Sequence, residues 1–138
     1  MFGDSSLDER TSDNTQQNCA PRACSLDEAE LLERLDGDAE LLHRLCAIYE
    51  QDRPRLMTQL RDAVAALDIG KVSFAAHRVG GLARNLGGTA AALAAGELER
   101  MARRSDLGGA SAVCELLDRQ LDGLTLSLQQ LRARIPRS

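Results

Sequence analysis

Apolar side chains recur at three- and four-residue steps through most of this chain, and no other feature limits its fold as strongly. A helix turns about 100° per residue, so this spacing gathers apolar side chains on one face, whereas a strand would need strict alternation. Short loops separate four such segments, which predicts an all-α fold, an antiparallel up-down four-helix bundle. The four apolar sets are Leu41, Leu45, Ile48, Leu56, Leu60, Val64 and Leu67; Val72, Ala75, Ala76, Val79, Leu82, Ala83 and Leu86; Ala90, Leu93, Ala94, Leu98 and Met101; and Ala110, Val113, Leu117, Leu121, Leu124, Leu128, Leu131 and Ile135.

A short additional N-terminal helix is expected before the first of these segments. Ser25 can cap its start, and Glu28, three residues later, completes a capping box. Asp36-Gly37 is a stop signal, so this helix should cover about residues 26–35.

Proline predicts an irregularity in the second helix, which Asp38 can cap. Pro54 lacks the backbone donor that a helix needs, so a kink or short break is expected near residues 51–53. The helix should then resume and run to about Leu67.

Turn and capping residues bound the remaining helices. Residues 68–70 form the turn into the third helix, and Gly87-Gly88 ends it. Thr89 can cap a helix over about residues 89–104, and Asp106 can cap the last one.

The ends of the chain differ in composition. Residues 1–24 are rich in Ser, Thr, Asp, Asn and Gln and have no helical or strand periodicity, which predicts a disordered tail or an interdomain linker. Residues 25–138 have the size of one helical-bundle domain. Aromatic residues make up only 2% of the chain, which favours aliphatic helix packing over a sheet.

Charge and hydropathy exclude several classes of partner. The net charge of −4 gives no general attraction to nucleic acid or to an anionic membrane. The start of the chain lacks the basic-then-apolar order of a secretory signal, and no apolar run is long enough to cross a bilayer. We therefore expect a cytoplasmic protein without membrane insertion. The last apolar stripe can be buried within one bundle, so a monomer is expected.

Metal-ligand patterns are weak. The four cysteines lack zinc-finger spacing and are interpreted as free thiols; they are Cys19, Cys24, Cys46 and Cys114. No Glu-x-x-His pair projects inward, which argues against a metal- or haem-binding bundle enzyme. We interpret His43 as an ordinary surface histidine. A charged face is interpreted as solvated; its members are Glu97, Glu99, Arg100, Arg103 and Arg104.

His77 is the residue most suited to chemistry. Helical spacing places it opposite the apolar face of its segment, where water and other proteins can reach it. Its neighbours on that outer face are Phe74, Arg78, Gly81, Arg84 and Asn85. From position alone, this is either a reactive histidine or an exposed histidine without a role.

The residues around His77 resemble the phosphoacceptor box of histidine-containing phosphotransfer (HPt) domains. The pattern is His-x-hydrophobic-x-Gly, then a hydrophobic residue and a glycine nine and ten positions after the histidine. The matching residues are His77, Val79, Gly81, Leu86 and Gly87. An acidic amphipathic start at residues 26–38 and an Asp-x-Pro at residues 52–54 extend the resemblance, which covers roughly residues 26–135.

The resemblance implies a phosphoryl carrier. The imidazole of His77 would take a phosphoryl group from an aspartate of one receiver domain and pass it to an aspartate of another. Histidine suits this role because its ordinary pKa near 6.5 leaves it largely neutral and nucleophilic. The implied partners are a response-regulator receiver domain, a hybrid sensor histidine kinase, or both; the chain could be a module detached from such a kinase. No cofactor is expected in this chain, because the receiver would supply the Mg²⁺.

One position departs from the family pattern. The family usually has a lysine three residues after the histidine, where this chain has Gly80. Arg84 is the best-placed substitute for stabilising the phosphoryl charge, and Arg78 is a weaker candidate. Side-chain-free and exposed positions are expected to contact an incoming receiver: Phe74, Gly80, Gly81 and Asn85. The missing lysine also keeps an alternative open, a non-catalytic HPt-like module that binds a receiver or a regulated enzyme without accepting phosphate.

Overall fold

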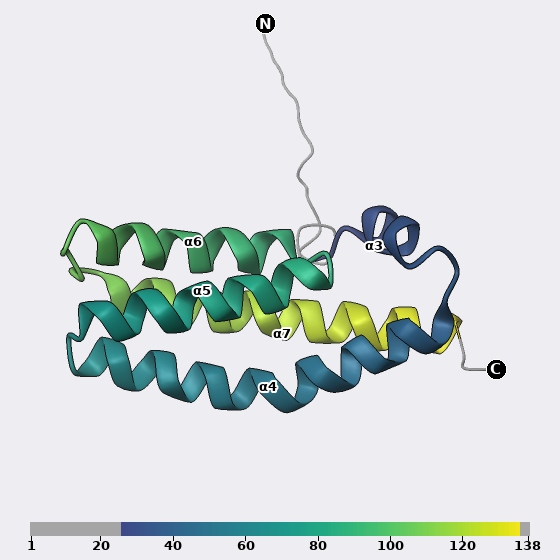
Figure 1. The fold of residues 1–138 in the computed structure, drawn as a ribbon, viewed down its shortest axis with the longest axis horizontal. Coiled ribbons are helices and arrows are strands. Elements are labelled where there is room, and N and C mark those ends of the chain that lie inside the picture. Colours follow the sequence, from purple (N-terminus) through teal and green to yellow (C-terminus); the bar gives the residue numbers. More distant parts are fainter. Residues whose placement is uncertain (1–25, 136–138) are drawn as a thin grey trace, which may run out of the picture.

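The described part of the chain, residues 26–135 of a computed structural model, consists of helices and the turns that join them (Figure 1). The helices are α3 (Glu28–Leu35), α4 (Ala39–Ala65), α5 (Ile69–Asn85), α6 (Thr89–Arg103) and α7 (Ala110–Arg134). The all-α prediction is confirmed over this range. The predicted tail, residues 1–24, lies outside the described residues and stays a prediction.

The four long helices lie alongside one another, and α3 sits at one end of them (Figure 1). α5 packs against α4 and α6, and α7 packs against the same two helices from the other side. Figure 1 shows each long helix joined to the next by a short connection, at alternate ends of the molecule. Aliphatic side chains fill the space between the helices, with Leu60, Leu98 and Leu124 fully buried.

Aspartate caps begin three of the helices. Asp38 and Asp68 cap α4 and α5, and each carboxylate accepts a hydrogen bond from the backbone N–H three residues later. α3 begins two residues later than predicted: Asp27, not Ser25, is its N-cap and accepts from the N–H of Glu30 at 3.1 Å. Ser25 lies outside the described residues.

Of the two expected irregularities near residues 51–53, a kink or a short break, the break is wrong, because α4 runs without interruption through Pro54. A proline removes only one hydrogen bond of the helical ladder, and a gentle bend can absorb its ring. Figure 1 shows α4 bowed and continuous. The helix ends at Ala65, before the predicted Leu67, which has a positive φ of 55° and closes the turn into α5.

The starts of α6 and α7 also differ from their predictions. Gly88 occupies the N-cap position of α6, and Thr89 is its first helical residue. α7 follows Gly109, whose φ of +86° suits glycine, so Asp106 is not its cap. The Asp106 carboxylate instead accepts from the N–H of Gly108 within the loop.

The predicted apolar face matches the buried face on α5, and on α4 and α6 it matches only in part. Ile48 and Leu93, predicted to be buried, are 44% and 65% exposed. In their place α4 buries a row one residue further along, Leu42, Cys46 and Tyr49. Tyr49 can be buried because its hydroxyl donates to the backbone oxygen of Leu121 at 2.9 Å. α6 correspondingly buries Ala91 and Ala95.

A polar network around Arg53 joins α4 to α7 just before the proline. Its guanidinium donates to the side-chain oxygens of Asp118 at 3.0 Å, Asp122 at 2.7 Å and Thr125 at 3.0 Å. It also donates to the backbone oxygen of Asp118 at 3.1 Å. Only 17% of the Arg53 side chain is exposed, so these bonds are partly shielded from water.

We predict that Arg53→Ala lowers the free energy of unfolding by about 2–3 kcal/mol, because it removes a largely buried guanidinium that donates to Asp118 and Thr125 of α7. Arg55→Ala is the matched control, since the Arg55 side chain is 54% exposed and pairs with nearby Asp52. That control should cost less than about 1 kcal/mol. Urea unfolding followed by circular dichroism measures both, and equal losses would contradict the assigned role of the network.

Candidate functional site

The site is built on the close packing of α5 against α6. The facing surfaces are lined mainly by small side chains, so the two helix backbones can approach closely. On α5 the buried residues are Val72, Ala75, Ala76, Val79, Gly80 and Ala83, and on α6 they are Ala91, Ala94, Ala95, Leu98, Met101 and Ala102. His77 lies at the edge of this contact, with 69% of its side chain exposed, as the helical spacing predicts.

A two-glycine turn sets the register between α5 and α6. Gly87 has a φ of +71°, and a β-carbon there would lie 2.9 Å from the backbone oxygen of Asp27. A β-carbon on Gly88 would lie 2.6 Å from the Leu124 side chain. The N–H of Asp27 donates to the Gly87 oxygen at 2.7 Å, which ties the start of α3 to this turn. Both positions therefore require glycine, and the helix pair that they join is fixed in register.

Glu99 holds the imidazole of His77. Its carboxylate oxygen Oε2 lies 3.1 Å from Nδ1 of His77, and only 16% of the Glu99 side chain is exposed. An ionised carboxylate accepts hydrogen bonds but donates none, so Nδ1 carries the proton in this pair. The neutral ring then has its lone pair on Nε2. The arrangement presents an oriented nitrogen nucleophile on an exposed ring.

The interpretation of Glu99 as a solvated surface carboxylate is therefore wrong. Helical spacing within α6 does not reveal this contact, because the partner of Glu99 lies on another helix. A register argument could have found it: in an antiparallel helix pair that turns at Gly88, positions equally far from the turn face each other. His77 precedes Gly88 and Glu99 follows it by the same number of residues.

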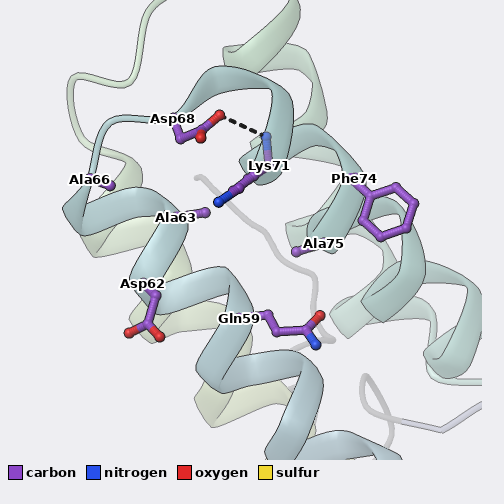
Figure 2. Close-up of a pocket in the computed structure, with 8 residues that line it drawn as sticks. All are labelled: Gln59, Asp62, Ala63, Ala66, Asp68, Lys71, Phe74 and Ala75. Atoms are coloured by element: carbon purple, nitrogen blue, oxygen red, sulfur yellow. Dashed lines mark hydrogen bonds between the residues drawn. The ribbon is translucent and has the colours of Figure 1, made fainter.

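Phe74 and Arg78 form an exposed pair beside His77. The Phe74 side chain is 62% exposed, and the guanidinium carbon of Arg78 lies 5.6 Å from the centre of its ring. Figure 2 shows Phe74 projecting from α5 next to a hollow between α4 and α5. The hollow measures about 480 Å³ and is bordered by Lys71 and Ala75 of α5 and by Gln59 and Asp62 of α4.

The two glycines after His77 have different surroundings. Gly81 is partly exposed, and a β-carbon there would meet nothing within 4 Å, so the surface beside the imidazole is open. Gly80, expected on the docking surface, is buried instead. A β-carbon on Gly80 would lie 3.2 Å from Nη1 of Arg84 and 3.4 Å from the Ala95 side chain. The Arg84 guanidinium thus covers Gly80.

The C-terminal end of α5 is held by α3. The guanidinium of Arg34 donates to the backbone oxygens of Arg84 at 3.0 Å and Asn85 at 3.1 Å. The acceptors are the backbone oxygens of Arg84 and Asn85, so the exposed side chains of these two residues take no part in the bonds. They fix the helix from which Arg84 reaches back towards Gly80.

Other candidate groups lie apart from this surface. His43 is half-buried and its Nε2 lies 2.9 Å from the Ile135 backbone oxygen, so it is not an ordinary surface histidine. Cys46 and Cys114 are free and buried, and burial raises the pKa of both thiols. Cys19 and Cys24 lie outside the described residues.

Across residues 26–135, no group of three His, Cys, Asp or Glu side chains is placed to hold a metal ion. None of the helices in the same range combines the length and the apolar character needed to span a bilayer.

A helical bundle that presents an oriented, exposed histidine on one flank has the features of a histidine phosphotransfer protein. A family model, the Hpt domain, matches residues 44–134, and the chain belongs to this family. Hpt domains are phosphoryl carriers of two-component phosphorelays, and they interact with receiver domains and histidine kinases. Neither the curated proteins nor the solved structures contain a match to this chain.

We predict that the Glu99 contact determines which ring nitrogen of His77 is protonated. In the wild-type protein at pH 8 the proton should lie on Nδ1, and in Glu99→Leu it should redistribute towards Nε2. Nitrogen-15 spectra of the imidazole ring distinguish these two states. Glu97→Leu, two residues before Glu99 and paired with Arg100, is the control and should leave the ring unchanged. An unaltered spectrum in Glu99→Leu would refute the role of Glu99.

Proposed function

We propose that this protein relays phosphoryl groups between receiver-domain aspartates and that His77 is the phosphoacceptor. The observation that supports this most directly is the contact between Nδ1 of His77 and the Glu99 carboxylate, together with the 69% exposure of the His77 side chain. Glu99 contacts Nδ1, and Nε2 stays available to attack phosphorus. A histidine without a task would not need this orientation.

The transfer uses few groups of this chain. The Nε2 lone pair attacks the phosphorus of a receiver aspartyl phosphate, a bond forms between nitrogen and phosphorus, and the phosphorus–oxygen bond to the aspartate breaks. The electron pair of that bond leaves with the aspartate carboxylate. The ring gains positive charge as the new bond forms, and the Glu99 carboxylate beside Nδ1 stabilises that charge. The return transfer reverses these steps, and the receiver supplies Mg²⁺.

The surface around His77 suits a visiting receiver. Gly81 leaves the neighbouring surface without a side chain, and Phe74 offers an exposed aromatic ring one turn away. Asn85 extends this exposed surface towards the end of α5. We infer that a receiver domain docks over these three residues, while buried Gly80 contributes indirectly. The antiparallel up-down order of the long helices would present this surface as one flank of a monomeric cytoplasmic bundle.

We predict that a phosphorylated receiver domain transfers label to the wild-type protein and that His77→Gln abolishes this labelling. The phosphate should be acid-labile and base-stable, as expected for a phosphoramidate linkage to histidine. Incubation with radiolabelled phospho-receiver, followed by electrophoresis and acid or base treatment, measures both properties. His43→Gln is the matched control, because it removes the other histidine of the chain.

Two results would contradict the proposal. Labelling that persists in His77→Gln would remove the site assignment. Wild-type protein that binds the receiver but is never labelled would favour the alternative, a module that docks without accepting phosphate, and the absence of a lysine at Gly80 is the observation that favours it.

A further inference from the structure

We propose that Arg84 is the cation that shields the phosphoryl group on His77, and that the lack of a side chain at Gly80 lets its guanidinium take that position. This inference rests on the proposed function, since it concerns the phosphorylated state of His77. It names the residue of this chain that would offset the charge of the phosphoryl group, which the contact between His77 and Glu99 does not do.

Phosphorylation of His77 would place negative charge beside an existing carboxylate. A phosphoryl group brings about two negative charges at neutral pH. The residue that orients the imidazole, Glu99, is itself an anion and lies 3.1 Å from the ring. A phosphoryl group on Nε2 would therefore sit on the same imidazole ring that the Glu99 carboxylate contacts. Repulsion between these two anions is unfavourable without a nearby cation.

The Arg84 guanidinium supplies such a cation through its contact with Gly80. A β-carbon on Gly80 would lie 3.2 Å from Nη1 and 3.5 Å from Nη2 of Arg84, so both ends of the guanidinium rest over that backbone. Gly80 follows His77 by three residues, or about 4.5 Å along the helix axis. The Arg84 side chain thus brings its charge back from its own position to within about one turn of the imidazole.

The guanidinium is free to take a new partner. No carboxylate within residues 26–135 forms an ion pair with Arg84. A guanidinium presents several donors in a plane and suits phosphate oxygens. It lies on an exposed surface, so binding a phosphoryl group would not require it to leave a buried pair.

The other arginines near the α5–α6 edge are less suited. Arg78 stacks on the Phe74 ring, and Arg100 pairs with Glu97 at 2.8 Å. Arg104 lies 3.8 Å from the same carboxylate. Arg103 is exposed and follows Glu99 by one helical turn, so it is the rival that an experiment must exclude.

The experiment loads the full-length protein with phosphoramidate, a small phosphoryl donor, and follows the phosphohistidine by ³¹P NMR as pH is changed. A nearby cation favours the dianion and lowers the phosphoryl pKa, so Arg84→Ala should raise that pKa by about half a pH unit. The double variant Gly80→Lys/Arg84→Ala should bring it back towards the wild-type value. The backbone bonds from Arg34 to α5 remain in Arg84→Ala, so the fold should be retained, which circular dichroism checks.

Arg119→Ala removes an exposed arginine of α7 and should titrate as the wild type does. An Arg84→Ala protein whose phosphoryl pKa equals that of the wild type would overturn the inference while leaving the phosphocarrier function intact. A shift seen in Arg103→Ala and absent from Arg84→Ala would also overturn it, in favour of Arg103. Wild-type protein that forms no phosphohistidine at His77 would overturn the proposed function itself.

Discussion

The close contact between α5 and α6 is the constraint on which the site depends. Alanine and glycine line most of this interface, so the two backbones lie near enough for Glu99 of one helix to reach His77 of the other. Glycines at the intervening turn fix the register, because a side chain at Gly87 or Gly88 would collide with Asp27 or Leu124. Small residues that look unremarkable in the sequence thus place the carboxylate beside the imidazole.

The same interface gives Gly80 a structural and an electrostatic meaning. In isolation, a glycine inside a helix costs roughly 1 kcal/mol relative to alanine. Here Gly80 packs against Ala95 and lies beneath the guanidinium of Arg84, so its lack of a side chain leaves room for that guanidinium. We infer that the chain, which lacks a lysine at this position, in this way still presents a cation near the imidazole.

Local sequence signals predicted the helices well, and the contacts between helices poorly. Most of the apolar face of α5 was predicted, because its spacing is regular and the outer face is polar. α4 has apolar residues on two sides, so Ile48 could not be distinguished from buried Tyr49 without knowing that Leu121 offers the phenol a hydrogen-bond acceptor. Glu99 and the buried Gly80 were misjudged for a related reason: their roles depend on α6 or on a folded-back side chain, which helical spacing within one segment does not report.

We propose that Glu99 holds Nδ1 of His77 and leaves Nε2 as the atom that accepts phosphate. The most direct test determines which ring nitrogen carries the phosphoryl group, by ¹⁵N and ³¹P correlation spectra of the phosphorylated, isotope-labelled protein. We expect a bond from phosphorus to Nε2, with Nδ1 still protonated or hydrogen-bonded to the carboxylate. Phosphate found on Nδ1, or on a residue other than His77, would contradict it.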